Sequence, residues 1–212
     1  ILMNTKQLSI ANRAQVIQPL DIDLADRIFS ESLINGLKPF NGLLNVELTD
    51  KDVPQSGKGI YKMYLLALDG VENFKVFNGA NDAKNLFFTP STNLLYRTLH
   101  DIDHALHYKE GKGTTSKDNE LFLNCLMAKR AYDYAIKSGY TLAQACMAFL
   151  CVYHDTVGQV YYYFQNNAFC DNQKELTAEL LADCKGMEYL NNGSITSAHQ
   201  YIIGLMNTCK VL

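Results

Sequence analysis

The second half of the chain repeats one pattern, in which apolar residues recur at helical spacing between polar capping residues and glycine-containing turns. Thr141 with Gln144, and Asn172 with Glu175, have the three-residue offset of a capping box at a helix start. Four amphipathic helices are expected, over residues 120–136, 141–164, 172–190 and 195–206. The sequence therefore predicts a mainly α fold, built as a helical bundle.

The N-terminal half is expected to add a helix over 21–37, a small antiparallel β-sheet and, directly after the sheet, a second helix for which Ser91 or Thr92 is the expected N-cap. Three short apolar and aromatic runs follow the first of these helices, at 61–68, 74–77 and 86–88. Asp69-Gly70 lies between the first two runs, and such a pair between apolar runs is a strong hairpin signal. The first two runs are predicted to form a hairpin, and the third to add one strand.

No linker-like run divides the 212 residues, so a single domain is predicted over 1–212, with the small β-sheet at about 60–90 and a helical metal-binding core at 91–212. The net charge of −3 is spread along the chain, which leaves no basic stripe for a nucleic acid. The six cysteines have no CxxC spacing and are expected to be reduced core residues. Without a signal peptide or a long apolar run, we expect a cytoplasmic protein that does not span a membrane.

Three of the five histidines lie within eight residues, on one predicted helix. His100, Asp101 and His104 are close enough in sequence to share a helix face, with His107 one turn further on. Glu120 opens the next predicted helix, after a polar loop. A single buried histidine is usually a core residue, but imidazole and carboxylate groups clustered at helical spacing are typical of metal sites. The candidate metal ligands are therefore His100, Asp101, His104 and Glu120, and the candidate ions are Zn²⁺, Fe²⁺ and Mn²⁺.

A second polar stretch interrupts the most apolar helix. Asp155 and Gln159 are four residues apart on one face, beside His154. Burying such groups is costly unless they are paired or functional, so all three are catalytic candidates, with Asp155 or His154 as the acid or base. The alternative is a polar network that only fixes helix packing. Gly158, unfavourable inside a helix, predicts the close approach of another helix or of a ligand.

On the residues His100-Asp101, His104 and Glu120, the chain resembles the family of the zinc protein of ubiquinone biosynthesis, whose helical fold holds a metal through HDxxH and a later glutamate. The resemblance implies that these four residues are the ligands. The chain is also similar to uncharacterised bacterial and phage proteins that combine HDxxH, a later glutamate and a DTxGQ segment, here residues 155–159.

Two further families share parts of the pattern. Zinc peptidases carry HExxH on a helix that follows a strand, and here Asp101 takes the place of their glutamate. The chain more distantly resembles HD-type phosphohydrolases, which use a histidine, a His-Asp pair and a final aspartate on separate helices. That order is supplied here by His100 or His104, then His154-Asp155, then Asp183.

The working hypothesis is a metal-dependent enzyme, a hydrolase acting on a phosphoester or another small molecule through a metal-bound water. The alternatives are a lyase or decarboxylase of the ubiquinone-biosynthesis type, and a non-catalytic binding module with a structural metal. A closed shell of four protein ligands favours the structural role, whereas an open coordination position favours catalysis. A small-molecule substrate is the expected partner, and homo-oligomer formation stays open.

Overall fold

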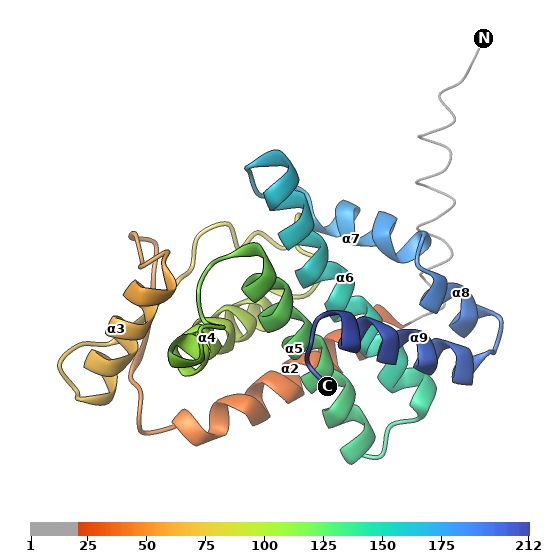
Figure 1. Ribbon diagram of the computed structural model, residues 1–212, viewed down its shortest axis with the longest axis horizontal. Helices are drawn as coiled ribbons and strands as arrows, with labels where there is room; N and C mark the ends of the chain where they lie inside the picture. The colour runs from red at the N-terminus through yellow and green to blue at the C-terminus, as the bar shows by residue number, and fades with distance from the viewer. Residues whose placement is uncertain (1–20) are drawn as a thin grey trace, which may run out of the picture.

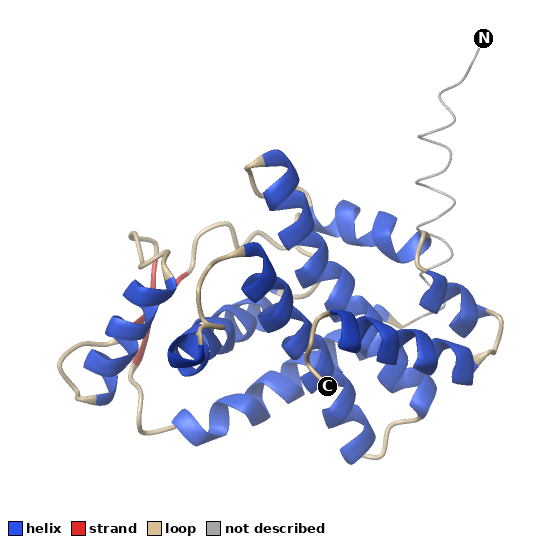
Figure 2. Cartoon of the chain, viewed as in Figure 1, coloured by secondary structure: helices blue, strands red, loops and turns tan. Residues whose placement is uncertain are grey.

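The computed structural model describes residues 21–212, and α-helices dominate this part of the chain (Figure 1, Figure 2). The described residues form eight α-helices, two short 3₁₀-helices and two short strands. In chain order these elements are α2 (Ile22–Leu37), η1 (Lys38–Phe40), β1 (Val46–Thr49), α3 (Gly57–Leu68), β2 (Phe74–Phe77), α4 (Pro90–His107), η2 (Tyr108–Glu110), α5 (Lys117–Lys137), α6 (Leu142–Asn166), α7 (Gln173–Ala182), α8 (Lys185–Asn191) and α9 (Ile195–Thr208). The prediction of a mainly α fold with a small sheet in the N-terminal half is confirmed.

The sheet is parallel, so the predicted antiparallel hairpin is wrong. Strand β1 pairs with β2 in parallel, and Val46 lies opposite Phe74. The run 61–68 belongs to helix α3 instead, because Ser56 caps its start by accepting a hydrogen bond from the backbone N–H of Gly59 at 3.1 Å. Asp69 and Gly70 then end this helix rather than turn a hairpin, with Gly70 in the left-handed region at φ 69°.

The predicted third strand at 86–88 is also wrong, since this segment is an irregular loop inside the core. Leu86, Phe87 and Phe88 are all buried, and Phe88 packs its ring 5.2 Å from that of Phe29 on α2. The loop leads directly into α4, where the Thr89 side chain caps the helix start in place of the predicted N-cap at 91 or 92. An apolar run can therefore be buried without strand pairing when it lies between helices.

Helix α4 lies between the two clusters of buried apolar side chains. Leu99 belongs to the larger cluster, formed mainly with α2, α5, α6, α8 and α9. Ile102 and Ala105 belong to the smaller cluster, formed with α3 and β2. Figure 1 shows α4 in this intermediate position, between α3 and the helices of the bundle.

Two close contacts fix how the helices pack. Asp103 is fully buried on α4 and accepts two hydrogen bonds from the guanidinium of Arg130 on α5, one of them at 2.7 Å. A Cβ atom on Gly158 of α6 would lie 2.4 Å from Cδ1 of Leu180. The predicted close approach at Gly158 is thus confirmed, and the neighbour is helix α7.

Within residues 21–212, no helix combines the length and the apolar character that crossing a membrane requires. The six cysteines are all free thiols. Five of them are buried, and Cys170 is partly exposed. The predicted core position is confirmed for these five cysteines.

The Asp103–Arg130 pair predicts a large loss of stability when one partner is removed. Asp103→Ala leaves the guanidinium of Arg130 without its carboxylate partner, so the free energy of unfolding should fall by about 3 kcal/mol in urea denaturation. Asp133→Ala is the control, because Asp133 pairs with Lys129 on the outside of α5 and should cost less than about 1 kcal/mol. Equal losses from the two substitutions would contradict the structural role of Asp103.

Candidate metal centre

Three side chains converge where α4 passes the first turn of α5. His100 and His104 lie one turn apart on α4, and Glu120 lies in the first turn of α5, after the loop that reverses the chain. The Nε2 atom of His100 lies 3.2 Å from Oε2 of Glu120, and Nε2 of His104 lies 3.2 Å from Oε1 of the same carboxylate. The two Nε2 atoms lie 3.2 Å from each other. This group of three can hold a metal ion.

The spacing of these atoms suits a small divalent ion. Zinc lies about 2.0–2.1 Å from nitrogen and oxygen ligands, which places the ligand atoms of a tetrahedral site about 3.4 Å apart. The three separations of 3.2 Å come within a few tenths of an ångström of that value. The geometry is therefore close to three corners of a tetrahedron.

A hydrogen bond sets the tautomer of His104. Its Nδ1 lies 3.1 Å from the carbonyl oxygen of Gly113. A carbonyl only accepts, so Nδ1 carries a proton, and in the neutral form of the ring Nε2 is the nitrogen whose lone pair is free for a metal ion. Backbone carbonyls orient many metal-binding histidines in this way. His104 is nearly fully buried, at 2% exposure.

Gly113 reaches this position because no side chain stands in the way. A Cβ atom on Gly113 would lie 2.0 Å from the carbonyl oxygen of His104, so the loop lies directly on the backbone of α4. Gly57, at the start of α3, is equally close on the other side, since its Cβ would lie 2.1 Å from the Gly113 oxygen. The carbonyl that orients His104 is thus held between two helices.

The charges of the site are strongly coupled. Burial favours the neutral form of Glu120, but hydrogen bonds with His100 and His104 outweigh it and hold the pKa of the carboxyl well below its usual range. Burial also works against a charge on His104, yet its contacts with Glu120 raise the pKa of the imidazole. Glu120 is therefore ionised at neutral pH, as a metal ligand must be.

Asp101, the fourth predicted ligand, is not one of the three converging residues. It lies close enough to feel the charges of His100, His104 and Glu120. Burial is the main reason that its pKa rises to about 6. The structure thus places Asp101 beside the group of three.

The three catalytic candidates lie on α6. Asp155 accepts a hydrogen bond from the hydroxyl of Thr177 on α7 at 3.0 Å. His154 packs edge-on against the ring of Tyr153, and its buried Nε2 has no hydrogen-bond partner in the described part of the chain. Burial lowers the pKa of His154 to about 4. Gln159 interacts with the Asp155 carboxylate, as their shared helix face predicts.

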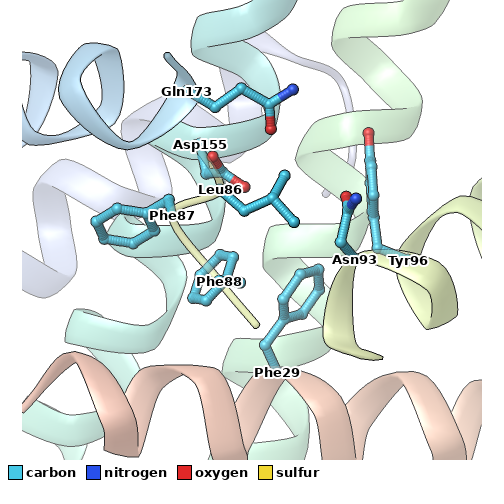
Figure 3. A pocket seen from close by; sticks show the side chains of 8 residues that line it. All are labelled: Phe29, Leu86, Phe87, Phe88, Asn93, Tyr96, Asp155 and Gln173. Carbon is cyan, nitrogen blue, oxygen red and sulfur yellow. The ribbon is translucent and has the colours of Figure 1, made fainter. Parts of the chain in front are cut away.

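A small pocket lies between Asp155 and Tyr96 (Figure 3). Figure 3 shows Asp155 and Gln173 on one side of this pocket and Asn93 and Tyr96 on the other, with Leu86 between them. The remaining wall is aromatic and is formed by Phe29, Phe87 and Phe88. Asp155 therefore lies on the far side of this pocket from Tyr96, which is itself in contact with His100.

Several residues that support the site were not singled out from the sequence. Tyr96 stacks on His100, Asn124 hydrogen-bonds to Glu120, and Gly113 accepts from His104. Spacing would have pointed to two of them, because Tyr96 lies four residues before His100 and Asn124 four residues after Glu120. Gly113 carries no such signal, since its role depends on the path of the loop.

Comparisons of this chain with known protein families, with curated proteins and with solved structures find no match.

Because Gly57 contacts the Gly113 carbonyl, we expect a substitution at Gly57 to lower metal affinity. Gly57→Ala places a methyl group against the Gly113 carbonyl, so the hydrogen bond to His104 should lengthen and metal affinity should fall about tenfold. Chelator competition measures the change. Gly204→Ala is the matched control, because a Cβ atom there meets nothing within 4 Å. An unchanged affinity in Gly57→Ala would show that the carbonyl does not support the site.

The Asp155 carboxyl predicts a pH-dependent stability. Burial raises its pKa to about 7, against hydrogen bonds from Thr177 and Gln159, whereas the carboxyl of an unfolded chain titrates near pH 4. Between these values the folded protein holds a proton that the unfolded chain has released, so the free energy of unfolding falls as pH rises. Asp155→Asn removes this penalty and keeps an acceptor for Thr177.

The difference in unfolding free energy, Asp155→Asn minus wild type, should therefore increase between pH 4 and pH 8 by about 2–4 kcal/mol. Denaturation of both proteins at each pH gives this difference, and titrations elsewhere in the chain cancel. A difference that stays constant over the whole range would contradict the raised pKa.

Proposed function

We propose that this chain is a metal-dependent enzyme, in which His100, His104 and Glu120 bind one divalent transition metal ion. The observation that supports this most directly is the convergence of two imidazole nitrogens and one carboxylate with separations of 3.2 Å. Two histidines and one carboxylate are the donor set of many catalytic zinc sites and of non-haem iron sites. Zn²⁺, Fe²⁺ and Mn²⁺ are the candidate ions.

The exposure of the three ligands favours a catalytic role. The His104 side chain is 3% exposed, but those of His100 and Glu120 are 13% and 18% exposed. The site is therefore partly accessible to solvent, and three protein ligands leave a coordination position for water. A metal-bound water with a pKa lowered to about 7 is a nucleophile at neutral pH.

The reaction we propose is hydrolysis of a phosphoester or another small-molecule substrate by that water. Asp155, His154 and Gln159 stay our candidates for the remaining catalytic groups. Asp155 has the best position of the three, because it lines the pocket whose opposite wall includes Tyr96. A lyase or a protein with a structural metal would use the same ligands. These two alternatives therefore differ from our proposal in whether phosphoesters are hydrolysed, and not in metal binding.

The first test is metal content. Purified protein should carry about one transition metal ion per chain by elemental analysis, or take one up on titration. Glu120→Gln and His104→Ala each remove one of three ligands and should weaken binding by at least tenfold. His107→Ala is the matched control, because His107 forms a similar 3.2 Å pair with Glu110 outside the group of three. A wild-type protein without affinity for any of the three ions would refute the proposal.

The second part of this test is turnover. Chromogenic phosphomonoesters and phosphodiesters should be hydrolysed by the metal-loaded protein. Chelation should stop the reaction, and the same metal should restore it. A fully loaded protein that hydrolyses none of these esters would remove the phosphoesterase proposal and favour the lyase or the binding module.

A further inference from the structure

The two metal-ligand histidines are oriented by different means. His104 donates its Nδ1 proton to the Gly113 carbonyl. His100 has no such acceptor, because its buried Nδ1 lacks a hydrogen-bond partner in the described part of the chain. Metal-binding histidines are normally held by a hydrogen bond from the ring nitrogen that does not bind the metal. Some other contact must hold the ring of His100.

The contact that restrains His100 is an aromatic ring. Tyr96 lies one turn earlier on α4, and its ring stacks on the imidazole with centroids 5.4 Å apart and planes 25° apart. On the other side, the His100 ring meets the His104 ring edge-on, at 4.6 Å between centroids. The imidazole of His100 therefore lies between two rings, and only Tyr96 is not itself a ligand.

The hydroxyl of Tyr96 extends this contact to the third ligand. It donates a hydrogen bond to Oδ1 of Asn124 at 2.5 Å. Asn124 is fully buried one turn after Glu120 on α5, and its Nδ2 donates to the Glu120 backbone carbonyl at 2.9 Å and to Oε2 at 3.4 Å. One tyrosine thus contacts His100 directly and the Glu120 carboxylate through Asn124.

We propose that Tyr96 and Asn124 are positioning residues, which hold the His100 ring and the Glu120 carboxylate in the orientation that binds the metal. This inference rests on the proposed metal centre. The stack on the Tyr96 ring restrains the His100 ring, whose Nδ1 has no hydrogen-bond acceptor in the described part of the chain. Asn124 contacts Oε2 of Glu120, the carboxylate oxygen that faces His100. Two of the three ligands are then set by a single network that joins α4 to α5.

The test distinguishes the role of the Tyr96 hydroxyl from that of the Tyr96 ring. Tyr96→Phe keeps the stack on His100 and removes only the hydrogen bond to Asn124, whereas Tyr96→Leu removes both. Tyr132→Phe is the matched control, because Tyr132 also stacks on a histidine, His199, and hydrogen-bonds to its Nδ1 at 2.9 Å. That second pair includes none of the three ligands.

Cobalt(II) is the probe, because its visible absorption bands respond to ligand number and geometry. We expect Tyr96→Phe to bind Co²⁺ about tenfold more weakly than wild type, with shifted bands, and Tyr96→Leu to bind it more weakly still. Tyr132→Phe should match wild type in affinity and spectrum. The melting temperature of each metal-free protein shows how much of any change is a general loss of stability.

Each result has a definite meaning. If Tyr96→Phe gives the wild-type Co²⁺ spectrum and affinity, the positioning role is refuted while the metal centre stands. If Tyr96→Phe and Tyr132→Phe weaken binding equally, the effect is general packing, and the proposal is again refuted. If wild-type protein binds no Co²⁺, the metal centre itself fails and this inference fails with it.

Discussion

A carboxylate held between two imidazoles at the contact of two helices is the constraint on which the rest of this site depends. Glu120 lies 3.2 Å from both His100 and His104, and partly buried groups of this kind must be compensated by charge or by hydrogen bonds. The relative position of α4 and α5 must therefore be tightly defined. The pair of buried Asp103 and partly exposed Arg130 joins the same two helices, which helps to fix the positions of the three candidate ligands relative to one another.

Most of the helical part of this fold is predictable from the sequence because its signals are local, although the one helix expected over 172–190 is divided into α7 and α8. Capping residues such as Thr141 and Asn172 mark helix starts in the structure as in the sequence. The sheet was mispredicted because Asp69-Gly70 can end a helix as well as turn a hairpin, and short apolar runs fit either element. The burial of 86–88 depends on surrounding helices that are distant in sequence.

The candidate ligands show the same division. His100 and His104 are predictable because one turn of helix separates them, and Glu120 because it lies in the first turn of the next helix. Asp101 lies on the same helix but is not one of the converging residues. Helix geometry fixes the direction of each side chain, but the sequence does not show which side of α4 packs against α5. The contact of Gly113 with His104 is not local, so its role follows only from the path of the loop. The hydrogen bond between Tyr96 and Asn124 likewise depends on how α4 packs against α5.

The residues that position the candidate ligands lie on both sides of α4. Asn124 contacts Glu120 from one turn further along α5, in the helical bundle. Gly113, by contrast, lies between the backbone of His104 and Gly57 at the start of α3. Helix α3 and strand β2 form the smaller apolar cluster on the other side of α4. A change in the packing of α3 would therefore move the carbonyl that sets the His104 tautomer. Helix α3 therefore helps to position His104, although it carries none of the three candidate ligands.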